Sequence, residues 1–223
     1  MGGRQIRIPA GNVALEGDLH VPAHAIGVVA FAHGSGSSRH SSRNRLVAER
    51  LRAAGLGTLL FDLLTEAEEA IDSYTTELRF DIGLLAERLI HATNWLAQDD
   101  ATATLPLGYF GASTGAAAAL VAVARQPATV GAIVARGGRP DLAGAALASV
   151  QAPTLLIVGG DDVPVIAMNE DAHARLAAPV KHLVIVPGAT HLFEEPGALE
   201  EVARLAADWF VRQLDVRARA QGV

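Results

Sequence analysis

The five residues Gly111-Ala112-Ser113-Thr114-Gly115 carry the strongest signal for chemistry in this sequence. They stand between the apolar run LPLGYF and the alanine-rich run AAAALVAVA, which indicate a buried strand followed at once by a helix. A serine on such a sharp turn exposes its hydroxyl above a sheet, and the helix N-terminus beside it favours developing negative charge. The same residues would also suit a glycine-rich turn in which Ser113 only caps the helix. The position between two buried elements favours a nucleophile.

A serine nucleophile needs a base, and the base needs an acid that orients it. With this type of turn, the acid follows the serine in the chain and the histidine comes last. The predicted strand TLLIV leads into Gly159-Gly160-Asp161-Asp162, and the predicted strand LVIVP leads into Gly188-Ala189-Thr190-His191. A carboxylate therefore lies just after the carboxyl end of the first of these strands, and the His191 imidazole just after that of the second. The pattern leaves Asp161 and Asp162 open as the acid, and His191 could instead cap the turn that follows it.

Acyl transfer also needs hydrogen-bond donors for the oxyanion, usually two backbone N–H groups. Thr114, the residue after the nucleophile, is expected to supply one of them. The other is expected from the loop 33–37, with Ser35 as the donor. His33 is interpreted as a structural residue that packs this loop.

Arginines gather near two predicted strand ends. They are Arg39, Arg43 and Arg45 after the oxyanion loop, and Arg136 and Arg139 on either side of Gly137-Gly138. A guanidinium can bind a carboxylate through two parallel hydrogen bonds, so Arg39 and Arg136 are candidate substrate-binding residues for an anionic substrate. The alternative is that these arginines pair with surface carboxylates such as Asp62, Glu66 and Asp141.

Short apolar runs that predict strands alternate with longer runs of helical periodicity. The predicted strands are 5–9, 13–21, 26–32, 58–61, 105–110, 133–135, 154–158 and 183–186, and the predicted helices are 44–54, 78–96, 114–124, 168–176 and 199–211. The first two strands alternate with period two and predict an antiparallel hairpin. The remainder predicts a mostly parallel sheet with helices on both faces, whose ligands bind beyond the carboxyl ends of the strands. The acidic run 66–69 is interpreted as a solvated loop or helix face.

Four stretches, FAHGSG, GYFGASTG, LLIVGGDD and PGATHLF, together resemble the α/β-hydrolase superfamily, and most closely its small dienelactone-hydrolase-like branch. The resemblance covers almost the whole chain. It implies an α/β-hydrolase fold with a mostly parallel sheet of about eight strands, helices on both faces, an N-terminal antiparallel hairpin and no cap domain. We expect this fold to form a single domain over residues 1–223.

The resemblance also implies roles for three residues: Ser113 as nucleophile, Asp162 as acid and His191 as base. Val163-Pro164 fixes the exit of the chain and also favours Asp162, which leaves Asp161 as a turn residue. Dienelactone hydrolases use a cysteine nucleophile, and this chain contains no cysteine. The resemblance therefore implies a serine hydrolase of an ester, a lactone or a related acyl bond, and leaves the substrate open.

Composition excludes several other classes. The net charge of −6 and the isoelectric point near 5.7 argue against a nucleic-acid binder. The absence of cysteine excludes disulfides, thiolate metal sites and a cysteine nucleophile. No signal peptide and no membrane helix is predicted, so we expect a soluble, cytoplasmic enzyme that acts on a small ester or lactone without metal or organic cofactor. The oligomeric state stays open.

Three rival functions can be weighed from the residues. A nucleotide-binding enzyme would use Gly34 and Gly36 after a buried strand, with Asp62 as the ribose ligand, but Arg39 stands where the third glycine of that motif belongs. A non-catalytic binding module could keep the fold, although such a decayed site would be expected to lose a triad residue. Acyl transfer to an acceptor other than water would use the same residues as hydrolysis.

Overall fold

An eight-stranded sheet runs through the centre of the computed structural model, which describes residues 3–221 and their side chains up to residue 215. The strands are β1 (Arg4–Ala10), β2 (Val13–His20), β3 (Val28–Ala32), β4 (Gly57–Phe61), β5 (Leu107–Ala112), β6 (Val130–Arg136), β7 (Thr154–Gly159) and β8 (Lys181–Val186). Their spatial order is β1-β2-β4-β3-β5-β6-β7-β8. β1 pairs antiparallel with β2 and β2 with β4, whereas all other pairs are parallel. The expected hairpin and mostly parallel sheet are thus confirmed.

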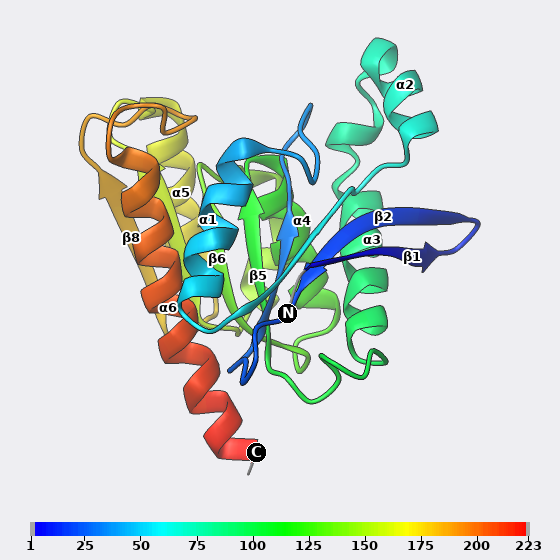
Figure 1. Cartoon of the computed structure of the whole chain (residues 1–223). Coiled ribbons are helices and arrows are strands. Elements are labelled where there is room, and N and C mark those ends of the chain that lie inside the picture. Colours follow the sequence, from blue (N-terminus) through cyan, green and yellow to red (C-terminus); the bar gives the residue numbers. More distant parts are fainter. Residues whose placement is uncertain (1–2, 222–223) are drawn as a thin grey trace.

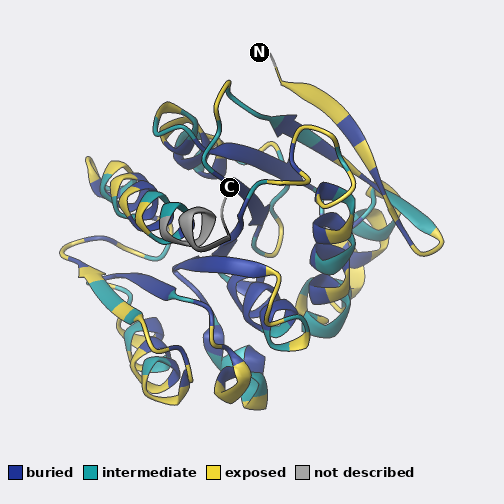
Figure 2. Cartoon of the chain, turned by 90° about the horizontal axis from the view of Figure 1, so that it is seen from below, coloured by how far each residue is buried: buried dark blue, intermediate teal, exposed yellow. Residues whose placement is uncertain are grey.

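Helices cover both faces of this sheet (Figure 1). They are α1 (Ser42–Ala53), α2 (Glu66–Thr75), α3 (Ile82–Leu96), α4 (Thr114–Arg125), α5 (Val163–Arg175) and α6 (Ala198–Gln221), with two 3-10 segments, η1 (Leu78–Phe80) and η2 (Pro140–Ser149). α1 and α6 pack on one face, and α3, α4 and α5 on the other. In Figure 2 the surfaces of these helices that face the sheet are buried, and their outer surfaces are exposed.

The central strands are apolar because they are enclosed by helices on both sides. Every residue of β3, β4, β5, β6 and β7 is buried. Phe31 and Phe110 pack with ring centroids 5.0 Å apart on the side of α1 and α6. Tyr109 points to the side of α3 and α4, where its hydroxyl bonds the hydroxyl of Thr93. These buried strands fix the positions of the loops at their carboxyl ends.

The single helix predicted over 78–96 is wrong, because the chain breaks at Asp81. The Asp81 carboxylate accepts the Leu84 N–H at 2.9 Å and so begins α3 at residue 82. The preceding turn η1 is held separately, since the Asp72 carboxylate accepts the N–H groups of Leu78 at 2.6 Å and Arg79 at 3.2 Å. The Asp81 cap of α3 and the separate bonds of Asp72 to η1 therefore divide what the apolar periodicity presents as one helix.

The acidic run 66–69 belongs to α2, which opens with a reciprocal cap. The Thr65 hydroxyl accepts the Glu68 N–H at 3.2 Å, and the Glu68 carboxylate accepts the Thr65 N–H at 2.8 Å. Together α2 and η1 form an excursion between β4 and α3 that rises above the carboxyl ends of the strands (Figure 1). This excursion, residues 66–80, is one helix and one turn, in keeping with the expected absence of a cap domain.

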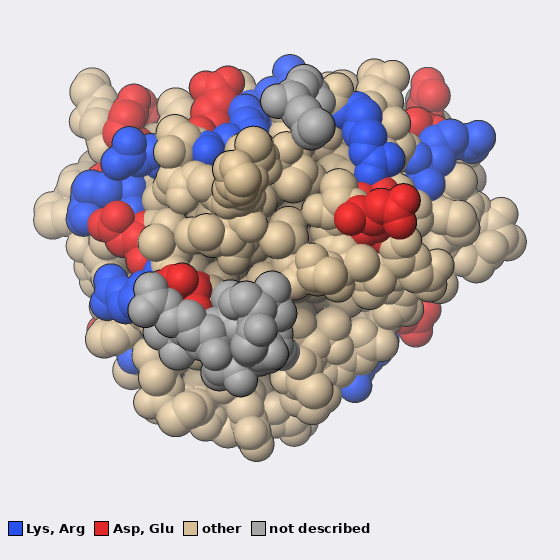
Figure 3. Space-filling model, turned by 60° about the horizontal axis from the view of Figure 1, so that its bottom comes forward, with Lys and Arg blue, Asp and Glu red and all other residues tan. Residues whose placement is uncertain are grey.

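The opposite end of the molecule presents a largely uncharged surface with positive and negative side chains interspersed around its rim (Figure 3). No helix within residues 3–221 is long and apolar enough to cross a membrane. The chemistry-bearing residues named above lie away from this end, at the carboxyl ends of β3, β5, β6, β7 and β8 or in the segments that follow them.

Candidate active site

Ser113 occupies a strained turn between β5 and α4. Its φ of 49° and ψ of −119° lie in a region that non-glycine residues rarely adopt. The flanking glycines allow this turn, because a Cβ on Gly111 would lie 2.5 Å from Ala116 Cα and one on Gly115 would lie 2.1 Å from the Ala32 carbonyl oxygen. Such an enforced turn is the geometry of a nucleophile elbow. The turn is therefore shaped by more than the need for a helix cap, and Ser113 makes no side-chain cap bond.

Asp162 and His191 are brought together from the loops after β7 and β8. His191 Nδ1 lies 2.6 Å from Asp162 Oδ2, and the Asp162 side chain is largely buried. Asp162 precedes α5 without using its carboxylate to cap it, which leaves that carboxylate free for the imidazole. Asp161 is exposed, and its N–H donates to the Ala189 carbonyl at 2.9 Å. Of the two adjacent acids, only Asp162 contacts the histidine.

The loop that carries His191 is held from both sides. The Glu195 carboxylate accepts the Thr190 N–H at 3.0 Å and the Thr190 hydroxyl at 2.6 Å, and these bonds lower the pKa of Glu195. Phe193 is buried, with a positive φ of 57°. A Cβ on Gly159 would lie 2.3 Å from the Ala189 carbonyl oxygen, so glycine lets this loop approach β7 closely. The sequence analysis did not identify Glu195 as a residue that holds this loop. The usable signal was a threonine next to His191, Thr190, with a glutamate five residues after it.

The Ser113 turn and the His191 loop meet at Gly137. The Ser113 N–H donates to the Arg136 carbonyl at 3.3 Å, and a Cβ on the next residue, Gly137, would lie 3.5 Å from the His191 ring. Among the described residues no hydrogen bond joins the Ser113 hydroxyl to His191. Such bonds are often long in free enzymes and tighten when substrate binds. The two groups share one edge of the sheet.

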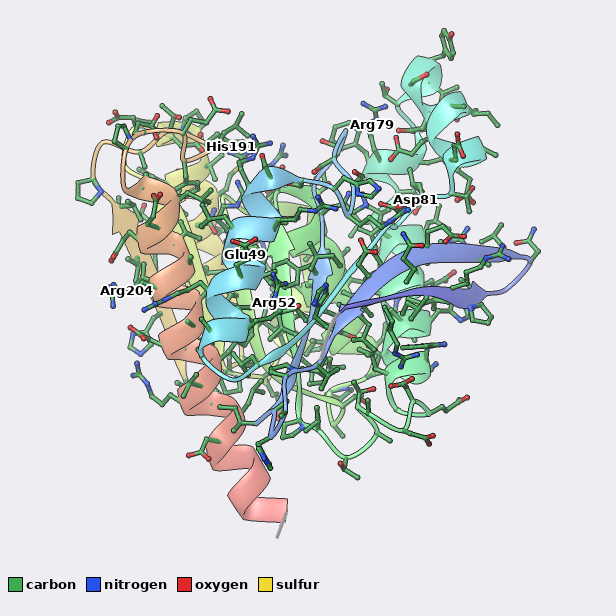
Figure 4. All side chains as sticks on the ribbon, viewed as in Figure 1. Glu49, Arg52, Arg79, Asp81, His191 and Arg204 are labelled. Atoms are coloured by element: carbon green, nitrogen blue, oxygen red, sulfur yellow. The ribbon has the colours of Figure 1, made fainter. Side chains whose placement is uncertain are left out.

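The expected oxyanion donors flank Ser113. Thr114 is the first residue of α4, so its N–H has no intrahelical acceptor. Ser35 is exposed on the loop after β3, and the neighbouring Gly34 packs so closely that a Cβ there would lie 3.1 Å from Ser113 Cβ. A small pocket touches both Ser35 and Thr114 and is also lined by Arg79 of η1. Figure 4 shows Arg79 and His191 at the same end of the molecule, on elements far apart in sequence.

His33 fixes the oxyanion loop. Its Nε2 accepts the Leu63 N–H at 3.0 Å, and its Nδ1 lies 3.0 Å from the Gly34 carbonyl oxygen, to which it donates. Burial lowers the pKa of His33, so the ring is neutral and can accept the Leu63 bond. This geometry agrees with a structural role.

The arginines named from the sequence fall into two kinds. Arg39 ion-pairs with Asp62 and also donates its N–H to that carboxylate at 2.7 Å. Arg139 forms two bonds to Asp141, at 2.9 and 2.8 Å. Arg136, by contrast, ends β6 buried, and among the described residues no carboxylate and no hydrogen-bond acceptor is found for its side chain. The surface-pairing alternative thus describes Arg39 and Arg139 but not Arg136.

No group of three or more His, Asp or Glu side chains within the described part of the chain is placed to hold a metal ion. The groups that the strand ends do bring to one edge are a strained serine, a histidine bonded to a buried carboxylate, and backbone N–H donors beside the serine. Chemically, this set can deprotonate a hydroxyl and stabilise an oxyanion.

Comparison with family models and solved structures points to one family. The family model described as "Dienelactone hydrolase family" matches residues 15–219. A crystal structure of dienelactone hydrolase from Anabaena variabilis is similar with 60% identity and a TM-score of 0.92, covering 96% of this chain and 99% of that one. Est1E from Butyrivibrio proteoclasticus, solved with ferulic acid bound, shares the fold, with a TM-score of 0.80 and 15% identity over 94% of this chain and 99% of that one.

A Mycobacterium tuberculosis protein that carries the name "Putative phosphoribosyl transferase" is 59% identical over 210 residues. The match covers 94% of this chain but 46% of that protein. The chain therefore spans about half the length of the curated relatives that it matches.

Proposed function

The chain belongs to the dienelactone hydrolase family, and from this premise we propose that it is a serine hydrolase that cleaves a carboxylic ester, a lactone or a related acyl bond. The observation that carries the proposal is the strained Ser113 turn at the same sheet edge as the 2.6 Å contact between Asp162 and His191. The family implies a hydrolase. The serine in place of a cysteine defines the kind of nucleophile.

In the proposed mechanism His191 removes the proton of the Ser113 hydroxyl, and the serine oxygen attacks the substrate carbonyl. Asp162 accepts the Nδ1–H of His191, which leaves Nε2 free as the base and stabilises the imidazolium that forms. The N–H groups of Thr114 and Ser35 bind the oxyanion. His191 then gives its proton to the leaving oxygen, and a water molecule that it deprotonates releases the acid from the acyl-enzyme.

The walls of the site support a small substrate. Short loops and the excursion 66–80 surround Ser113 and His191, and the pocket beside Thr114 is small. Short-chain soluble esters or lactones are therefore expected to be better substrates than long-chain lipids. Preference for long-chain triglycerides, with activation at an oil interface, would contradict this part of the proposal. The expected cytoplasmic location stays a prediction.

The name of the Mycobacterium relative does not lead to a second proposal. This chain matches about half of that protein, and a name given to the whole does not assign its activity to the matched half. The matched residues include the Ser113 turn and the His191 loop, whose geometry favours acyl chemistry. Acyl transfer to an acceptor other than water would use the same groups, and product analysis separates it from hydrolysis.

Active-site labelling tests the proposal directly. A fluorophosphonate should label the wild-type protein on Ser113 and should not label Ser113→Ala. On an activated ester the alanine variant should lose ~10⁵-fold in turnover with its circular dichroism unchanged, since the covalent step is lost. Release of free acid from a panel of esters and lactones then establishes hydrolysis. Retention of more than a tenth of the turnover in Ser113→Ala would overturn the assignment.

A further inference from the structure

Arg136 is a buried cation for which the described part of the chain provides no counter-ion. The residue is 6% exposed, its Nε is sealed from solvent without a partner, and no ion pair or hydrogen bond of its guanidinium is found among the described residues. Desolvation by burial lowers its pKa to about 10, so it remains charged at neutral pH. An unpaired buried charge is costly, and buried charges in proteins are normally paired. Something outside the described side chains is therefore expected to meet this guanidinium.

A second arginine stands beside it. Arg43, in the first turn of α1, reaches Glu194 at 3.4 Å, and Arg136 Cζ lies 5.8 Å from the ring centroid of the preceding residue, Phe193. The two guanidinium groups therefore contact adjacent residues of one loop, and the charge of Arg43 adds to the lowering of the Arg136 pKa. Arg43 Nε is likewise buried without a partner, and within the described residues the only carboxylate near its guanidinium is the exposed Glu194, at 3.4 Å. The first turn of α1 contains no acidic residue. Two guanidinium groups and the positive end of a helix thus gather with a single distant, solvated carboxylate.

We infer that Arg136 and Arg43 form a binding site for a small oxyanion, a carboxylate or a phosphate group, beside the His191 loop. Of the three guanidinium nitrogens of Arg136, only Nε is both sealed from solvent and unpartnered, so the terminal nitrogens keep contact with solvent. Planar guanidinium groups bind carboxylate and phosphate through paired hydrogen bonds. The Phe193 ring, whose centroid is 5.8 Å from Arg136 Cζ, holds the guanidinium in place. The incoming anion would displace Glu194 from Arg43.

The site adjoins the proposed catalytic groups through the backbone. The carbonyl of Arg136 accepts the Ser113 N–H at 3.3 Å, and Phe193 follows His191 by two residues. An oxyanion on Arg136 would therefore sit against the histidine loop, while the backbone of the same arginine supports the serine turn. It could be a second anionic group of the substrate or a free anion that supports the loop, and the same chemistry recognises both.

Anion-dependent thermal stability tests the site without any reference to catalysis. Phosphate and succinate are each titrated against chloride at constant ionic strength. Wild-type protein should gain ~2–5 °C in Tm at anion concentrations well above Kd, because only the folded state binds. Arg136→Met should lose this gain, whereas its Tm in chloride should not fall, since an unpaired buried charge has been removed. An unchanged anion-dependent gain in Arg136→Met, or no gain in wild type, would overturn the inference.

Three further variants keep the test decisive if Arg136→Met does not fold. Arg43→Gln should reduce the gain by about half or more, because one of the two guanidinium groups is lost. Glu194→Gln should enlarge it, since the competing carboxylate is removed from Arg43. Arg204→Gln on α6, where the arginine is exposed and paired to Glu201 and Asp208, is the matched control and should leave the gain unchanged. Equal gains in Tm for the wild type and these three variants would mean non-specific anion binding and would contradict the site.

A kinetic comparison, which depends on the proposed esterase activity, identifies the source of the anion. Two activated esters of equal chain length are compared, one neutral and one with a terminal carboxylate. If the anion belongs to the substrate, Arg136→Met loses ~10–100-fold in kcat/KM on the charged ester and little on the neutral one. Equal losses on both esters would assign the site to a free anion. Absence of turnover on either ester would contradict the proposed function, while the thermal test of the site would stand.

Discussion

The Ser113 turn and the excursion 66–80 border the same edge of the sheet, but different forces hold them. The turn lies between β5 and α4, whose residues are almost all buried, and its glycines are required by backbone atoms 2.1–2.5 Å from where a Cβ would be. The excursion presents Tyr74, Ile71 and Phe80 to solvent at 91%, 60% and 52% exposure. The Asp72 carboxylate, through its bonds to Leu78 and Arg79, is the main connection between α2 and η1.

The difference separates two tasks of the site. A nucleophile must be held within tenths of an ångström, and close packing around Ser113 provides this. A substrate-facing wall can be held by a few polar bonds, and such segments open locally at low free energy. Changes near the turn should therefore act on catalysis or on the whole fold, whereas changes in the excursion should act locally.

After the loss of the Ser113 nucleophile itself, the largest expected effect comes from the acid that contacts His191. Asp162→Asn should leave folding intact but place the imidazole in the wrong tautomer, with a loss of up to ~10⁴-fold in turnover. Asp161→Asn should lose less than about tenfold, because asparagine is equally suited to an exposed turn. Both variants are measured on one activated ester at pH 8, with circular dichroism to check the fold. If Asp161→Asn is the impaired variant, Asp162 is not the acid.

Steric pressure at the turn gives the next effect. Gly115→Ala should lower the free energy of unfolding by more than ~3 kcal/mol, since its Cβ would overlap the Ala32 carbonyl oxygen. Gly11→Ala, in the β1–β2 turn, is the matched control: its φ of 68° is strained for alanine, but nothing lies within 4 Å. The free energy of unfolding of this control should fall by about 1 kcal/mol. Urea unfolding measures both, and similar losses would show that packing does not define the turn.

The excursion should respond locally. Asp72→Ala removes the acceptor of the Leu78 and Arg79 N–H groups, so limited proteolysis within residues 66–80 should accelerate ~10-fold while Tm changes by less than ~3 °C. Asp81→Ala is the control from the neighbouring helix end. Because Asp81 caps α3, which packs on the core, its loss should lower global stability by ~1 kcal/mol without selective cleavage of the excursion. A global loss in Asp72→Ala would erase the distinction between the two regions.

The smallest effect is a pH dependence from His33, which links the oxyanion loop to Leu63. Its pKa in the folded protein lies below the ordinary value of 6.5. Its stabilising contribution is therefore complete above pH 6.5 and declines as pH falls below that value, because only the unfolded state then takes up the proton.

Between pH 7.5 and 5.5 the wild-type free energy of unfolding should fall by ~1 kcal/mol more than that of His33→Gln. Burial also lowers the pKa of His20, but both proteins keep that residue, so their difference isolates His33. His40→Gln, at an exposed position, should retain the full wild-type fall. Equal pH dependence in wild type and His33→Gln would mean that the Leu63 bond does not depend on a neutral ring.

Much of the fold could be predicted because its elements are set by local pattern. Continuous apolar runs such as VVAFA predict buried parallel strands, and the glycines around Ser113 predict the turn from sterics alone. The break at Asp81 was missed because apolar periodicity continues across it, although an aspartate before the run Ile82-Gly83-Leu84 is a cap signal. The start of α2 was missed as well, although the threonine and glutamate at 65 and 68 form a capping-box signature.

The partners of the arginines could not be predicted in the same way. Arg39 finds Asp62, 23 positions away, whereas Arg136 finds no carboxylate among the described side chains. Pairing of this kind depends on which loops the finished sheet brings together. The choice between Asp161 and Asp162 is similar, since both follow β7 and only the placement of the His191 loop separates them.

Detection of an acyl-enzyme tests the central claim most directly. Wild-type protein is mixed with an activated acetate ester, quenched in acid within the first turnovers, digested, and analysed by mass spectrometry. The account predicts a mass increase of one acetyl group on the peptide that contains Ser113, with none in Ser113→Ala, and a burst of released alcohol equal to the enzyme concentration. Turnover without an acyl adduct on Ser113, or an adduct on another residue that accounts for the turnover, would contradict it.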